Sequence, residues 1–161
     1  MGKYKVKLDF FKLVKREIRI MLKNFSIIYS FSTFFVIASL IFVFSVNDIS
    51  YVKIFYKSIV WIVLIFSIML VSENFLNEDF NDGSLKELQF LGFSEESIMV
   101  SKSIAMWVMI MIPMLFLLPL FFVFFQITLY ELISLLINLF LATPSLTLIS
   151  ILSSFFSGKP L

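Results

Sequence analysis

The sequence has 161 residues, of which 60% are hydrophobic and 15% are charged, with a net charge of +2 and a mean hydropathy of +1.02. A soluble domain of this size leaves much of its surface in water and has no means of covering so much apolar area. The composition therefore excludes a soluble globular protein and predicts a membrane domain. The absence of Cys and His excludes disulfides, thiolate metal sites and histidine ligation of zinc or heme iron within this chain.

The N-terminal region carries eight Lys or Arg in its first 23 residues. These are too many and too spread for a secretory signal, so we expect a retained N-terminus. From Asp9 to Lys23, apolar residues recur at helical spacing while basic residues fall on the other side. This predicts an interfacial helix over 9–23 that touches membrane lipid, with basic stems along an anionic leaflet and Phe and Ile in the acyl boundary. A basic flank that only orients the protein is a compatible alternative.

Four apolar runs follow, each near or above the ~20 residues that a helix needs to cross a bilayer. We place the spans at residues 25–46, 54–72, 101–126 and 130–156. The 73–100 connection is long and charged. Eleven basic residues lie on the side of the two termini and this connection, against two, Lys53 and Lys57, at the first hairpin. The positive-inside rule therefore places both termini and the 73–100 loop in the cytoplasm or matrix.

The 73–100 loop is acidic, which is unusual beside an anionic leaflet. Asp82, Gly83 and Ser84 predict a turn followed by a helix start, with Ser84 as the N-cap and Glu87 at the capping-box spacing. One side of this short helix is apolar, formed by Leu85, Leu88 and either Phe90 or Leu91. A helix on the lipid surface is one interpretation, but the acidity favours a protein partner.

The later spans carry polar residues and prolines. Pro113 and Pro119 in the third span and Pro144 in the fourth predict bends. One face of the fourth span holds Ser134, Asn138, Ala142 and Ser145, with Thr143, Thr147 and Ser150 beside it. This composition is typical of helix packing in lipid, and a polar translocation surface is the alternative. Lys102 and Trp107, near the start of the third span, are typical of a snorkelling lysine and an interfacial aromatic.

No catalytic constellation emerges, because the sequence has no phosphate-binding GxxxxGK[ST] loop, no GxSxG elbow and no HExxH. We therefore expect a protein that is not an enzyme and that relies on another chain for nucleotide energy. Basic residues cluster only beside the membrane, so nucleic-acid binding is not expected. The predicted fold is all-α: one polytopic helical membrane domain over 1–161, with four spans, an interfacial helix and a coupling helix.

Four stretches occur in an order that resembles the CcmB family, the heme exporter protein B of cytochrome c maturation. They are "FLNEDFNDGSLKEL", "SKSIAMW" with its Lys-to-Trp spacing, "IPMLFLLP" with two prolines, and "LATPSLTLIS". The resemblance covers residues from about 60 to 156. Family members have Glu where this chain has Lys86, Gly where it has Ala142, and six spans where we count four, so we expect a reduced chain, a fragment or a separately encoded remainder.

The resemblance implies an ABC-exporter membrane subunit with a cytoplasmic coupling helix and a CcmA-like ATPase partner. It implies that this ATPase binds Asp79, Asp82, Gly83, Ser84, Leu85 and Leu88. It further implies CcmC-like and CcmD-like membrane partners, a homodimer, and heme and ATP handled by partner subunits, with no cofactor bound by this chain. The expected location is a bacterial or mitochondrial inner membrane. The permease of another drug, lipid or polysaccharide exporter, and a non-transporting scaffold, stay open as alternatives.

Overall fold

The computed structural model describes residues 2–23, 25–45 and 49–158. Over these residues all the secondary structure is helical, in six helices. Their bounds are α1 Gly2–Lys23, α2 Phe25–Ser45, α3 Ile49–Asn81, α4 Ser84–Phe90, α5 Glu95–Phe125 and α6 Leu129–Gly158. The predicted all-α fold class is confirmed.

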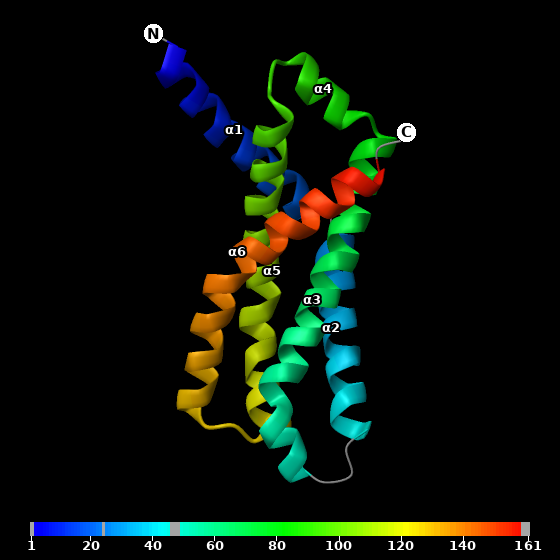
Figure 1. The fold of residues 1–161 in the computed structure, drawn as a ribbon, viewed down its shortest axis with the longest axis vertical. Coiled ribbons are helices and arrows are strands. Elements are labelled where there is room, and N and C mark those ends of the chain that lie inside the picture. Colours follow the sequence, from blue (N-terminus) through cyan, green and yellow to red (C-terminus); the bar gives the residue numbers. More distant parts are fainter. Residues whose placement is uncertain (1, 24, 46–48, 159–161) are drawn as a thin grey trace.

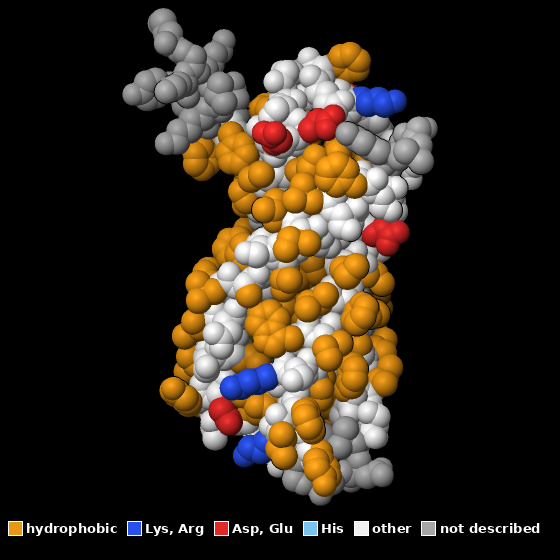
Figure 2. Space-filling view, in the orientation of Figure 1, with side chains coloured by type: hydrophobic (Ala, Val, Ile, Leu, Met, Phe, Trp, Pro, Cys, Tyr) orange, Lys and Arg blue, Asp and Glu red, His pale blue; other side chains and the backbone are white. Residues whose placement is uncertain are grey.

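Helices α2, α3, α5 and α6 are each long and apolar enough to cross a membrane, which confirms the four predicted spans. Helices suit this environment because all their backbone hydrogen bonds are made within the segment. Figure 1 shows α1, α4 and the end of α6 at one end of the bundle, while α3 and α6 both begin at the other end. On the face drawn in Figure 2, charged side chains gather toward the two ends and hydrophobic side chains cover the middle.

Helix α5 is the centre of the bundle, since it contacts each of the other five helices. Its buried stripe includes Ile98, Lys102, Met106 and Met109, residues spaced three or four apart. A lysine therefore occupies a position in the core stripe of the most central helix.

The region 73–100 differs from the predicted long loop. Helix α3 continues to Asn81 and α5 already begins at Glu95, so 82–83 and 91–94 are the parts outside helices. The predicted short helix does lie between them, as α4.

The length of α3 explains how α4 is carried away from the membrane. Its 33 residues correspond to about 50 Å at 1.5 Å per residue, against ~30 Å of hydrocarbon. The helix persists beyond the span because Phe75 and Leu76 continue the buried stripe of Val71. Helix α4 thus stands at the end of a rigid extension of a span.

Helix α1 has three faces where the sequence predicted two. Leu13, Glu17 and Met21 are buried where α1 packs on α5. A second face is basic and includes Lys12, Lys15, Arg19 and Lys23, whose side chains are exposed. A third is apolar and exposed, with Phe11 and Leu22. The last two faces suit a membrane surface, whereas the first fixes the helix to the bundle.

Candidate functional site

Two glycines in the left-handed region delimit α4. Gly83 has φ 72° and precedes the helix as its N-cap, and Gly92 has φ 87° just after its end. The Gly92 N–H donates to Gln89 O at 2.9 Å and the Phe93 N–H to Leu88 O at 3.2 Å, which closes the last turn. These conformations favour glycine, because a side chain on any other L-residue is strained there.

The predicted capping box is wrong. Ser84 is the first residue of α4 and not its N-cap, and no side chain caps the helix start. The Ser84 hydroxyl instead donates to Oδ1 of Asp79 at 2.7 Å. The serine is therefore used to join α4 to the end of α3.

The predicted ATPase contact requires Leu85 and Leu88 to be exposed on α4, but the structure buries both. Leu85 and Leu88 are 6% and 2% exposed, because they pack into the chain's own core. They are thus not available to a partner, which corrects the prediction for both. The exposed apolar residues are Phe90 at 91% and Leu91 at 74%. Asp82 is also exposed.

A buried cluster of ionisable groups lies beneath α4, where α1, α3 and α5 meet. The Lys102 Nζ donates to Oε2 of Glu17 at 2.7 Å and to Oδ2 of Asp79 at 2.6 Å. The side chains of Lys102 and Glu17 are 1% and 0% exposed, and that of Asp79 is 14% exposed. The same nitrogen lies 4.7 Å from the ring centroid of Phe75. We call Glu17, Asp79 and Lys102 the charge centre.

Both carboxylates of the charge centre use their second oxygen as well. The Oε1 of Glu17 accepts from the Arg16 guanidinium at 2.7 Å, and the Oδ1 of Asp79 accepts from Ser84. Two positive and two negative groups therefore balance, and the carboxylate oxygens are satisfied. This matters because a buried charge is tolerated only when it is paired and hydrogen-bonded.

The charge centre changes the interpretation of two predicted residues and adds a third. Lys102 is not a snorkelling lysine, because it is buried and paired. Asp79 was expected to bind an ATPase but faces inward instead. Glu17 was not singled out, although its place between Leu13 and Met21 on one helical stripe is the signal that marks it.

The polar contacts of α6 use a different face from the one predicted. Trp107 Nε1 donates to Thr143 Oγ1 at 3.0 Å, and the Ser103 and Thr147 hydroxyls are 3.3 Å apart. Asn138 and Ser145 are exposed, so they do not form this contact within the chain. A role for these two residues in packing against another chain stays a prediction.

The prolines stand within continuous helices. Figure 1 shows α6 changing direction partway along its length, and Pro144 lies inside this helix. Proline lacks the N–H that would bond the preceding turn, which accounts for a bend. Helix α5 runs through Pro113, which is buried, and through Pro119, whose side chain is outside the described part.

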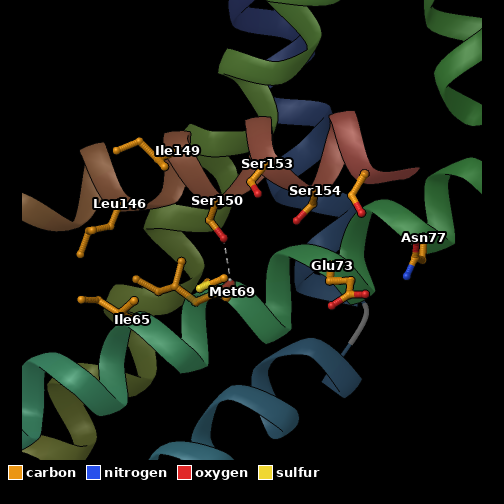
Figure 3. Close-up of a pocket in the computed structure, with 11 residues that line it drawn as sticks. Ile65, Met69, Glu73, Asn77, Leu146, Ile149, Ser150, Ser153 and Ser154 are labelled. Atoms are coloured by element: carbon orange, nitrogen blue, oxygen red, sulfur yellow. Dashed lines mark hydrogen bonds between the residues drawn. The ribbon is translucent and has the colours of Figure 1, made fainter. Parts of the chain in front are cut away.

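A groove of about 480 Å³ lies between α3 and the second half of α6. Figure 3 shows serines of α6 above it and residues of α3 below, with a dashed line for the Ser150 hydroxyl, which donates to the backbone oxygen of Ile68 at 3.5 Å. Ser150 and Ser72 are joined by a 2.5 Å hydrogen bond that ties α6 to α3. Glu73 and Asn77 line the same groove and are exposed. Its lining is mixed, because hydroxyl, amide and carboxylate groups lie beside the apolar side chains of Ile65, Leu146 and Ile149.

Comparison with known proteins adds one finding. A family model described as CcmB protein matches residues 8–157, which is most of the chain. The matched range includes the charge centre, α4 and the groove. A search of curated proteins finds no match.

Proposed function

The chain belongs to the CcmB family, which gives it the role of a heme exporter permease in cytochrome c maturation, and from this premise we propose that it couples ATP hydrolysis on a partner chain to work in the membrane. The partner is a CcmA-like ATPase, and the work is heme delivery or release of a heme-loaded chaperone. Heme and ATP are handled by partner subunits, among them CcmC-like and CcmD-like membrane proteins. The chain itself is a transporter subunit and not an enzyme.

The observation that carries the proposal is the exposed apolar pair Phe90 and Leu91 at the end of α4. An amphipathic helix offers such anchors to a hydrophobic groove of a partner, and nearby charges such as exposed Lys86 set the register. Leu85 and Leu88 hold the other side of α4 to the core. The anchors are therefore presented on a fixed support, which lowers the entropic cost of docking.

The distribution of basic residues supports an inner-compartment location for α4. Helix α4 and helix α1, which carries the basic face, lie at the same end of the bundle (Figure 1). Lys53 and Lys57 belong to the first part of α3, which begins at the opposite end. Basic residues favour the cytoplasmic or matrix side, where ATP is available to the ATPase. We place the protein in a bacterial or mitochondrial inner membrane with both termini on that side.

The docking proposal is tested by replacing the exposed pair. Phe90→Ser with Leu91→Ser should weaken retention of the ATPase on membranes by about tenfold or more, because buried aromatic anchors dominate interface energies. The measurement is co-sedimentation of purified ATPase with vesicles that contain the full chain.

The matched control is Leu129→Ser with Tyr130→Ser, a second exposed leucine–aromatic pair at the start of α6. This control should leave retention unchanged. Equal retention by the Phe90–Leu91 variant and the unchanged chain, at equal expression, would show that α4 does not dock the ATPase.

Two other functions are separated by genetics. Deletion should abolish c-type cytochromes while other export continues, whereas the permease of a drug, lipid or polysaccharide exporter gives the reverse. A non-transporting scaffold would still support maturation with a catalytically dead ATPase, and the proposed coupling would not.

A further inference from the structure

In the described part of the chain, no Cα atom of α1 lies within 8 Å of a Cα atom of α4. The backbone of α1 keeps the same separation from that of α3, which carries α4. A continuous polar path nevertheless joins them: Glu17 on α1, Lys102 on α5, Asp79 on α3 and Ser84 on α4, each linked to the next by a hydrogen bond of 2.6 to 2.7 Å. Lys102 is the member of this path that bridges the two halves.

The bridge depends on charge as well as on packing. One ammonium is shared by carboxylates from two helices that are otherwise apart, in an interior where electrostatic interactions are stronger than in water. If Lys102 is removed, Glu17 keeps its bond to Arg16 and Asp79 its bond to Ser84, but both carboxylates lose the cation that they share and repel each other. The bridge thus attracts α1 and α3 to α5 when it is intact and drives them apart when its cation is lost.

We propose that Lys102 is the positioning residue through which movement of α4 is transmitted to α1, so that the ATPase moves the interfacial helix as well as the spans. The inference rests on the proposed function, because it needs an ATPase that moves α4. The transmitted displacement reaches a helix whose basic face and exposed Phe11 and Leu22 suit lipid headgroups and acyl chains. The contacts between α1 and the membrane surface would then change each time the ATPase moves α4.

The absence of cysteine in the chain makes the movement measurable. In the reconstituted complex with its ATPase, a single environment-sensitive fluorophore is placed on α1 through Phe11→Cys or on α4 through Glu87→Cys. Both side chains are exposed. The choice of Glu87 leaves Lys86, Phe90 and Leu91 unchanged for docking. The label is attached before the ATPase is added, and the fluorescence change on ATP and vanadate is recorded. In the unchanged background both labels should respond.

The decisive background is the neutral variant Glu17→Gln, Asp79→Asn and Lys102→Met, which removes all charges of the charge centre together. Neutralising a whole buried ion cluster often leaves stability unchanged, and this is checked by the unfolding temperature and by ATPase retention. We expect the α4 label to respond as before and the α1 label to lose about fivefold or more of its response. Glu17→Gln alone removes only the carboxylate that α1 contributes. It should likewise leave the α4 response unchanged and reduce the α1 response.

The possible outcomes separate the two proposals. An undiminished α1 response in a stable neutral variant overturns the inference, because packing alone would then transmit the movement. A response at α4 with none at α1 in the unchanged background also overturns it. If neither label responds while the ATPase is active, the proposed function fails first. Should the neutral variant not fold, Glu17→Gln alone decides between the same outcomes.

Discussion

The largely buried side chains of Glu17, Asp79 and Lys102 are paired with one another between α1, α3 and α5. This pairing determines how much stability a single substitution among them costs. Removing one partner from a buried ion pair leaves a charge without compensation, which costs about 3–5 kcal/mol. Replacing all partners together leaves no charge without compensation, and replacement of a buried ion pair by hydrophobic residues of similar volume is often without net cost. The effect of a change at Lys102 therefore depends on whether Glu17 and Asp79 change with it.

Lys102→Met should lower the free energy of unfolding by about 3–5 kcal/mol, because Glu17 and Asp79 lose their shared cation and Asp79 is left largely buried without an ion pair among the described residues. The neutral triple variant with Glu17→Gln and Asp79→Asn should recover most of that loss. Denaturant unfolding in detergent, followed by the fluorescence of Trp61 and Trp107, measures both. A loss below about 1 kcal/mol for Lys102→Met, within the range of exposed pairs, would contradict the burial of the charge centre.

The sequence contains part of the signal for this cluster. Lys102 falls on the stripe of Ile98 and Met109, and Glu17 falls between Leu13 and Met21, so each interrupts an apolar face. A charge at such a position predicts a buried partner. What the sequence does not provide is the pairing itself, because Glu17 and Lys102 are 85 residues apart and meet only once α1 has packed on α5.

At the scale of single elements, the position of α4 is set by its two glycine turns and by the hydroxyl of Ser84. The capping-box prediction failed because the N-cap is Gly83, one residue earlier than expected, and Ser84 already belongs to the helix. Its hydroxyl donates to Asp79 on the extended end of α3.

Leu85 and Leu88 share one apolar face as predicted, but that face is turned to the core, and Phe90 and Leu91 are exposed instead of completing it. An apolar stripe on a short helix fits a partner's groove and the chain's own core equally well, and only the fold of α3 and α5 decides between them.

Gly83→Val should loosen α4 because φ at this position is 72°, which costs a β-branched residue about 1–2 kcal/mol. Gly83→Asn should cost less, since asparagine tolerates the left-handed region. No atom lies within 4 Å of an added Cβ, so the difference reports backbone strain alone. Hydrogen exchange of the α4 amides is the measurement, and equal exchange in the two variants would contradict the assigned turn.

At the scale of the whole molecule, the number of spans follows directly from the sequence. A segment can cross a bilayer only if its backbone N–H and C=O groups are hydrogen-bonded within the protein, which a helix achieves by itself. Four apolar runs of sufficient length therefore predict four spanning helices, and the described residues contain four candidates. The helix ends were less predictable, because α3 and α5 extend into the region 73–100 by burying apolar residues against each other and α4. Polar residues in that region suggested a loop, but packing on one face was enough to keep it helical.

The arrangement as a whole places α1 and α4 at one end and the start of α3, which carries Lys53, at the other. The charge centre then joins the helix that faces the ATPase to the helix that faces the lipid, through α5, which touches every other helix. Coupling of this kind requires elements that move as a unit between two states. It also requires α4 to lie in the compartment that contains ATP.

The most direct test of the central claim is the side of the membrane on which α4 lies. Lys86→Cys and Lys53→Cys are made separately in the cysteine-free chain and treated with a membrane-impermeant maleimide in sealed vesicles of known orientation. The account predicts that Lys86→Cys reacts only from the cytoplasmic or matrix side and Lys53→Cys only from the opposite side. Reaction of Lys86→Cys from the outer side would contradict it, because no ATPase could then reach α4.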